Sequence, residues 1–257
     1  TYGLQDQVDA VNRAAVAAAR AAAKEKQWPG GAWVCGTMGP TGLLPSSSDP
    51  SLAQASFEEC AQLYAEQAAV LVDAGVDILL LETAQDLLEL RAALSAVRAV
   101  CSDAARKVPL SVQVSMDEHG HMLLGSTIDA FVGAVGNCIP AVMGFNCGMG
   151  PDQMRPLIER LLDTAPCAVS MIPNAGIPHN RDGEAVYDMP PEVFAAALAP
   201  CVSELGVGVV GGCCGTTPDH IRALCAGLDG RECATRKKVP GVFCGGGLRG
   251  VDLERTE

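Results

Sequence analysis

The residues of this chain best suited to chemistry are two neighbouring cysteines, Cys213 and Cys214, in the segment GVVGGCCGTT at 208–217. A third cysteine, Cys147, closes the segment GFNC at 144–147. Three cysteine thiolates can hold zinc, which takes four tetrahedral ligands and keeps one position open in catalytic sites. Their spacing alone leaves two other interpretations open, namely thiols packed in the core or a strained disulfide between the two neighbours.

A shared metal site places demands on the elements that carry these cysteines. Neighbouring residues of a strand point to opposite faces of a sheet, so Cys213 and Cys214 can bind one metal only if the chain turns there. The glycines on both sides of the pair permit such a turn. Cys147 lies 66 residues before Cys213 (213 − 147), so the fold must bring the ends of separate strands together.

Apolar segments alternate along the chain with segments of helical periodicity, which predicts βαβ units and a parallel sheet. The expected strands lie within 32–42, 76–83, 108–116, 141–147, 167–176 and 207–214. The expected helices cover 4–26, 53–74, 86–100, 127–136, 152–163, 190–205 and 218–228.

Six strands with one helix in front of them fit two architectures. An open doubly wound sheet needs no further strand, whereas a (βα)8 barrel needs eight and would lack its first two. The leading helix, which has no strand before it, favours the truncated barrel. In both folds functional groups lie at the carboxyl ends of strands. The chain places Glu82 with Thr83, Cys147, Asn174 and the cysteine pair at such ends.

Composition and charge exclude several classes of protein. The chain has 257 residues, enough for one α/β core. Its 18 basic and 30 acidic residues give a net charge of −12 without a basic stripe, so we expect neither nucleic acid nor a membrane as partner. No apolar segment reaches the roughly 18 residues of a membrane span, and the charged, alanine-rich start is not a signal peptide. The 12 cysteines lack the compact spacing of secreted scaffolds, which predicts reduced thiols and a cytoplasmic location.

Three motifs make the chain similar to the homocysteine S-methyltransferase family: GFNC at 144–147, PNAGIP at 173–178 and VVGGCCGTTPDHIRAL at 209–224. The stretches TYGL, GTMGPTG, EQAAVLVDAGVDILLLET and LLGST add to the similarity. It is closest to the homocysteine-binding modules of cobalamin-dependent methionine synthases. The resemblance implies a (βα)8 TIM barrel domain over 1–228 that lacks its first two strands, followed by a linker-like tail over 229–257.

The resemblance also implies a site and a reaction. Cys147, Cys213 and Cys214 would bind Zn(2+), and Glu82 would hold the amino group of homocysteine. Asn174 would lie near the metal and fill its fourth ligand position before substrate arrives. The implied reaction is attack of zinc-bound homocysteine thiolate on a methyl group, which forms methionine. Methylcobalamin is the implied methyl donor, with S-methylmethionine or betaine as alternatives.

The implied partners are homocysteine and cobalamin- and folate-binding modules of the same or a partner chain. The tail segment FCGGGLRGVDL is similar to the stretch that leads into such a folate-binding module, and the chain starts without methionine. We therefore expect a fragment or a processed product. Two other hypotheses remain: a phosphate-handling barrel lyase or aldolase, with phosphate on the GGCCGTT loop, and an inactive fragment or scaffold of a multidomain protein.

The remaining histidines and several cysteines are expected to play structural or no special roles. We expect His119 and His121 to be exposed loop residues rather than metal ligands, and His220 to be structural. The cysteines expected in the core are Cys35, Cys60, Cys101 and Cys167.

Overall fold

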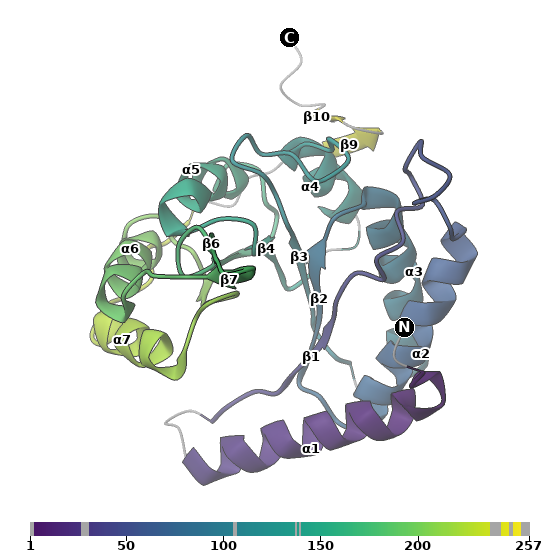
Figure 1. The fold of residues 1–257 in the computed structure, drawn as a ribbon, viewed down its shortest axis with the longest axis horizontal. Helices are drawn as coiled ribbons and strands as arrows, with labels where there is room; N and C mark the ends of the chain where they lie inside the picture. Colours follow the sequence, from purple (N-terminus) through teal and green to yellow (C-terminus); the bar gives the residue numbers. More distant parts are fainter. Residues whose placement is uncertain are drawn as a thin grey trace. The chain divides into compact units, whose positions relative to one another are not determined.

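The computed structural model describes residues 3–26, 31–104, 107–136, 138, 140–236, 243–246 and 249–252. The chain divides into two compact units, residues 1–111 and 112–257. Helices and strands alternate through both units (Figure 1).

Unit 1 contains two parallel strands and the helices that accompany them. Its elements are η1 (Gln5–Gln7), α1 (Val8–Lys26), β1 (Cys35–Met38), α2 (Phe57–Asp73), β2 (Ile78–Ala84) and α3 (Leu87–Asp103). β1 pairs with β2 so that Met38 is level with Leu81, the residue before Glu82. α2 and α3 pack against each other (Figure 1). α3 begins after Asp86, whose carboxylate accepts hydrogen bonds from the first-turn backbone and so caps the helix.

Unit 2 contains the strands whose ends carry the three cysteines of interest. β3 (Leu110–Val114) crosses the boundary between the units. The following elements are α4 (Ile128–Gly136), β4 (Val142–Asn146), α5 (Pro151–Leu162), β5 (Ala168–Ile172), β6 (His179–Arg181), β7 (Glu184–Val186), α6 (Pro191–Ser203), β8 (Val209–Val210), α7 (Pro218–Leu228), β9 (Phe243–Gly246) and β10 (Arg249–Asp252). β4 pairs in parallel with β5, and β5 with β8. The long buried stretches of β4 and β5 are typical of parallel strands covered on both faces.

The order of the strands decides between the two expected architectures. Within the described ranges, the main sheet has the order β1-β2-β3-β4-β5-β8, and a helix follows each of these six strands before the next one begins. A doubly wound sheet reverses its strand order at a switch point, whereas the wall of a (βα)8 barrel runs in sequence order. The predicted barrel-type α/β fold is therefore confirmed. No helix among the described residues is long and apolar enough to cross a membrane.

Strands β4 and β5 approach each other closely at Gly144. A Cβ atom at this position would overlap the carbonyl and hydroxyl oxygens of Ser170. The Ser170 hydroxyl is fully buried and accepts a 2.9 Å hydrogen bond from Nε2 of Gln113 on β3. Glycine at 144 thus lets three neighbouring strands pack around one buried polar contact.

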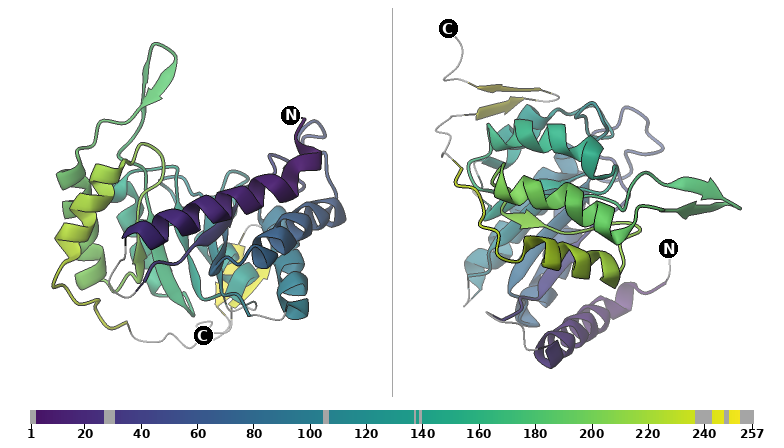
Figure 2. Two further views of the ribbon diagram at one scale, coloured as in Figure 1. Left: turned by 90° about the horizontal axis from the view of Figure 1, so that it is seen from below. Right: turned by 90° about the vertical axis from the view of Figure 1, so that its left-hand side faces the viewer.

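Two short hairpins were not predicted. The polar loop after β5 contains the antiparallel pair β6–β7, which extends away from the rest of unit 2 (Figure 2). Its turn residues Asp182 and Gly183 both have positive φ, as the favoured two-residue hairpin turns require, so the Asp-Gly pair was the available signal. In the tail, where we expected an irregular linker, β9 and β10 pair with each other and pack on α4.

Two smaller expectations were also wrong. The last strand was expected over 207–214, but β8 covers only Val209–Val210 because the glycine-rich segment leaves the sheet and turns. Cys35 was expected in the core but is exposed, because the residues of β1 alternate between an exposed and a buried face.

Candidate metal centre

The three cysteines of interest come together in unit 2. The Sγ atoms of Cys147, Cys213 and Cys214 all lie within 4.8 Å of one another. The Sγ atoms of Cys147 and Cys214 are 3.7 Å apart. All three are free thiols, so no disulfide joins the two neighbours.

Cys147 reaches the cluster from the end of β4. Its backbone has φ of 61°, in the left-handed region that side chains other than glycine rarely adopt. The backbone N–H of Cys147 donates a 3.1 Å hydrogen bond to the carbonyl of Ile172 on β5, which supports this conformation. Backbone strain of this kind is concentrated at functional sites.

Cys213 and Cys214 reach the cluster from the turn that follows β8. Gly215 completes this turn with φ of 76°. The N–H of Cys213 donates to the carbonyl of Pro173 at 2.8 Å, and the N–H of Ala175 donates to the carbonyl of Cys214 at 2.9 Å. These bonds tie the cysteine pair to the PNAG loop after β5.

Two buried asparagine side chains contact the thiols. Asn174 accepts a 3.1 Å hydrogen bond at Oδ1 from the N–H of Cys214, and its side chain helps to lower the pKa of the Cys147 thiol. Asn146 donates from Nδ2 to Sγ of Cys213 at 3.8 Å. Each asparagine is 2% exposed, so the two amides are fixed in place. Asn146 is a further residue of this site, and its position beside Cys147 in GFNC is the sequence signal for it.

The thiols do not share negative charge evenly. The pKa of the Cys147 thiol is lowered to about 5, first by a hydrogen bond from Cys213 and then by the N–H of Gly148, Cys214 and Asn174, against an opposing effect of burial. The same hydrogen bond raises the pKa of Cys213, and burial and the neighbouring thiolates raise it further. The surrounding protein therefore favours the thiolate of Cys147 over that of Cys213, and a bound cation would stabilise thiolates further.

The arrangement of the sulfurs fits such a cation. Tetrahedral zinc with Zn–S bonds of about 2.3 Å places its sulfur ligands about 3.8 Å apart. The 3.7 Å separation between Cys147 and Cys214 agrees with this value, and the other pairs lie within 4.8 Å. Thiolates are soft ligands that favour zinc over calcium or magnesium. In the part of the chain that the structure describes, this is the only group of histidine, cysteine or acidic residues close enough to hold a metal in this way.

Tyr187 also belongs to this site and was missed from the sequence. It follows β7 directly, and its ring packs on Gly215, where a Cβ atom would overlap the tyrosine. The pKa of Tyr187 is raised, first by burial and then by the neighbouring Cys214 side chain. Nothing in the local sequence distinguishes this tyrosine from an ordinary loop residue.

Glu82 belongs to unit 1, whereas the three cysteines and Asn174 belong to unit 2. Glu82 is half-buried near the carboxyl end of β2, and Thr83 after it has φ of 58°. The GTMGPTG loop after the neighbouring strand β1 is anchored by Glu89, which is 1% exposed. Oε1 of Glu89 accepts hydrogen bonds from the N–H of Thr41 at 2.7 Å and from the hydroxyl of Tyr64 at 3.1 Å.

Three of the four histidines were expected to be exposed in a loop or structural, and their surroundings agree. His119 and His121 are exposed and lie 3.9 and 3.7 Å from neighbouring acidic side chains. His220 is 6% exposed. Its Nδ1 accepts from the N–H of Thr217 at 3.2 Å, and its Nε2 lies 2.9 Å from the carbonyl of Met189. A backbone N–H can only donate and a carbonyl can only accept, so the ring of His220 links the start of α7 to Met189.

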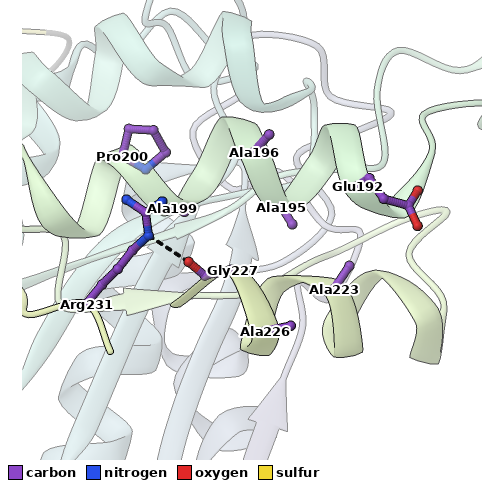
Figure 3. Close-up of a pocket in the computed structure, with 9 residues that line it drawn as sticks. All are labelled: Glu192, Ala195, Ala196, Ala199, Pro200, Ala223, Ala226, Gly227 and Arg231. Atoms are coloured by element: carbon purple, nitrogen blue, oxygen red, sulfur yellow. Dashed lines mark hydrogen bonds between the residues drawn. The ribbon is translucent and has the colours of Figure 1, made fainter. Parts of the chain in front are cut away.

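A separate pocket of about 510 Å³ lies between α6 and α7 (Figure 3). Its lining residues are Glu192, Ala195, Ala196, Ala199, Pro200, Ala223, Ala226, Gly227 and Arg231. Arg231 uses its Nε to donate a 2.8 Å hydrogen bond to the carbonyl of Gly227. The lining has no thiol, hydroxyl or imidazole group, so we place the functional site at the cysteine cluster instead.

Comparison with known proteins shows the family to which the chain belongs. The chain matches the homocysteine S-methyltransferase family over residues 1–228. It belongs to that family. It is 37% identical over 228 residues to the methionine synthases of Mycobacterium leprae (strain TN) and Mycobacterium tuberculosis (strain ATCC 25618 / H37Rv). These matches cover 88% of this chain but 18% and 19% of the two relatives, so the chain spans less than a fifth of their length.

Solved structures of a homocysteine methyltransferase share the fold of this chain. The apo form of MmuM from Escherichia coli aligns with a TM-score of 0.65 and 21% identity, covering 88% of this chain and 76% of that one. Its metallated form aligns with a TM-score of 0.61 and 21% identity, covering 85% and 69%. At this level of identity the similarity establishes the fold.

Proposed function

We propose that this chain binds zinc through Cys147, Cys213 and Cys214 and transfers a methyl group to the sulfur of homocysteine, forming methionine. The observation that carries the proposal is the separation of the thiols, with one Sγ pair at 3.7 Å and all three within 4.8 Å. Membership of the homocysteine S-methyltransferase family supports the reaction class.

The reaction needs homocysteine as a thiolate. At an ordinary pKa of about 8.5, only about 3% of a thiol is ionised at pH 7, and bound zinc would lower that pKa. The thiolate sulfur then attacks the methyl carbon, and the donor leaves with the electron pair of the broken bond. Three cysteinates would carry more negative charge than a bound dication carries positive charge, which would keep the substrate sulfur electron-rich.

The buried amides hold the ligand set in place. Asn174 fixes the backbone of Cys214, while Asn146 contacts Cys213. Such neighbours of metal ligands set ligand orientation and metal affinity. For Asn174 to fill the fourth ligand position before substrate arrives, its Oδ1 would have to release the N–H of Cys214. We retain that role as part of the proposal.

The charge of Glu82 supports the proposed contact with the substrate, and the relatives support the proposed methyl donor. We propose that the carboxylate of Glu82 pairs with the ammonium group of homocysteine, since it is half-buried beside the end of a parallel strand. The long relatives are named methionine synthases, and we propose methylcobalamin as donor, presented by cobalamin- and folate-binding modules of the same or a partner chain. A reducing, cytoplasmic setting would keep the ligand thiols free.

Zinc content tests the proposal directly. The purified chain should contain about one zinc ion by elemental mass spectrometry, and Cys214→Ser should lose it. Cys225→Ser is the matched control, because Cys225 is an exposed cysteine on α7 outside the cluster and its loss should leave zinc content unchanged. A metal-free wild-type chain, or zinc retained by Cys214→Ser, would contradict the metal centre.

A methylation assay tests the reaction itself. Zinc-loaded chain, homocysteine and methylcobalamin should yield methionine, detected by mass spectrometry, and Cys214→Ser should reduce the rate to about that of the reaction without protein. Methionine formed equally well by Cys214→Ser would refute zinc-dependent methyl transfer at this site. Replacing methylcobalamin with S-methylmethionine or betaine identifies the donor.

A further inference from the structure

We infer that Ser115 is a substrate-binding residue, whose hydroxyl donates a hydrogen bond to the carboxylate of homocysteine at the metal centre. The inference rests on the proposed function and adds a contact to it. That function assigns the substrate sulfur to the metal and the ammonium group to Glu82, and it leaves the substrate carboxylate without a partner.

The first support is the place of Ser115 in the chain. Ser115 directly follows Val114, the last residue of β3, just as Cys147 directly follows Asn146, the last residue of β4. β3 and β4 are hydrogen-bonded neighbours in the main sheet. Ser115 and Cys147 therefore come at the carboxyl ends of two adjacent strands, where functional groups of this type of fold gather.

The second support is the face of the sheet on which Ser115 lies. The side chain of Gln113 reaches Ser170 of β5 across Gly144 of β4, so Gln113 points to the face that these residues share. The helix α4 covers the opposite face, because Phe145 of β4 packs against it. Side chains two residues apart on a strand point to the same face, so Ser115 continues the row of Gln113, away from α4.

The third support is a close approach between Ser115 and the loop that carries a proposed ligand. Gly148 comes immediately after Cys147 and has φ of 75°. A Cβ atom on Gly148 would lie 3.0 Å from Oγ of Ser115 and 2.8 Å from the carbonyl oxygen of Met116. The hydroxyl of Ser115 thus lies against the residue next to Cys147, at the edge of the metal centre.

The fourth support is that this hydroxyl is available to a ligand. Ser115 is half-buried, and its hydroxyl has no hydrogen-bond partner among the residues that the structure describes. Two neighbouring hydroxyls are already engaged, because Ser170 bonds to Gln113 and Thr216 donates to the carbonyl of Cys213 at 2.7 Å. Ser115 can therefore donate to a substrate without giving up a bond within the protein.

A carboxylate at this centre needs hydrogen-bond donors, because three cysteine sulfurs already make the centre rich in negative charge. The arginine side chains that the structure describes in unit 2 do not supply them, since each forms hydrogen bonds elsewhere: Arg155, Arg160, Arg181, Arg222, Arg231 and Arg236. A serine hydroxyl can donate to an anion, and such a bond is stronger than one between neutral groups.

The test measures substrate binding by the zinc-loaded full chain. Wild type and Ser115→Ala are titrated by calorimetry with homocysteine and with homocysteamine, which is homocysteine without its carboxylate. We expect Ser115→Ala to raise the Kd for homocysteine about tenfold, because a hydrogen bond to a charged group is lost. The Kd for homocysteamine should stay unchanged, and so should the zinc content and the melting temperature.

Ser111→Ala is the matched control, because Ser111 lies on the same strand four residues earlier, about 13 Å from Ser115. It should bind both ligands as wild type does. An unchanged Kd for homocysteine in Ser115→Ala would overturn the role of Ser115 alone. Equal weakening of both ligands, or loss of zinc from Ser115→Ala, would also overturn the contact with the carboxylate. Wild type that holds no zinc, or holds zinc but does not bind homocysteine, would overturn the proposed function itself.

Discussion

Cys147 and Cys213 differ in how readily their thiols ionise. The pKa of Cys147 is lowered and that of Cys213 is raised, in each case mainly by the interaction between the two side chains. The left-handed backbone at Cys147 and the N–H of Gly148 add to the stabilisation of one anion. A metal-free centre would therefore hold one thiolate ready for the first bond to an incoming cation.

This asymmetry predicts selective chemistry in the metal-free protein. Iodoacetamide attacks thiolates, and a pKa of about 5 keeps Cys147 ionised until the pH falls through that value. We expect its alkylation rate to be half-maximal near pH 5 by peptide mass spectrometry. Cys167, whose pKa burial raises to about 11, should stay unmodified at pH 7.

The matched variant for this experiment is Cys213→Ala, which removes the largest cause of the shift. It should move the half-maximal alkylation of Cys147 to higher pH. A Cys147 rate in the native sequence that rises only above about pH 8, as for an ordinary thiol, would contradict the assigned hydrogen bond.

At the scale of elements, the site depends on how closely its strands pack. β4 and β5 carry Cys147 and Asn174 just beyond their ends, and Gly144 allows their close approach within the sheet. A displacement of one strand would pass directly to the ligands, because Cys147 is bonded through its N–H to Ile172 of the other strand.

Gly144→Ala should lower the free energy of unfolding by about 3 kcal/mol, since the added methyl group meets backbone and cannot be accommodated by a rotamer change. Gly208→Ala is the matched control, because its Cβ would make ordinary 3.5 Å contact with Ala168. We expect that variant to stay within about 1 kcal/mol of the native sequence in urea denaturation. Equal effects of the two substitutions would argue against the close approach at Gly144.

In unit 1, the start of α3 anchors the loop after β1. Glu89→Ala would leave the N–H of Thr41 and the hydroxyl of Tyr64 without this acceptor, which should cost about 2–3 kcal/mol of stability. Amide hydrogen exchange at Thr41 should become faster. Ser56→Ala, which removes the exposed N-cap of α2, should cost about 1 kcal/mol and leave exchange at Thr41 unchanged. Unaltered exchange at Thr41 in Glu89→Ala would contradict the anchoring role.

At the scale of the whole molecule, all three proposed ligands lie in unit 2, on loops that backbone hydrogen bonds already join. A ligand that binds only the folded state raises stability in proportion to its free concentration. Free zinc at 100 times its Kd should therefore raise the free energy of unfolding by about 2.7 kcal/mol, measured by denaturation with and without a chelator. Cys214→Ser should show no zinc-dependent shift, and a shift of equal size in that variant would place the metal elsewhere.

Much of the fold could be predicted because its signals are local. Apolar runs and helical periodicity gave the strands and helices of the main sheet, and the motifs around Cys147 and Cys213 gave the family. Tyr187 could not be found in this way, because only the folded chain brings its side chain against Gly215, next to Cys214. The hairpin β6–β7 has strands too short to show periodicity, so only its Asp-Gly turn marked it.

The short length of β8 restricts how this part of the chain can vary in length. Only Val209 and Val210 pair with β5, so the alignment of the cysteine pair depends on the bonds from Gly211 to Met171 and from Cys213 to Pro173. Inserting or deleting one residue between Val210 and Cys213 would shift both sulfurs relative to Cys147. The tip of the β6–β7 hairpin, by contrast, could be lengthened without moving a ligand, which makes it the natural place to attach a label or a tether.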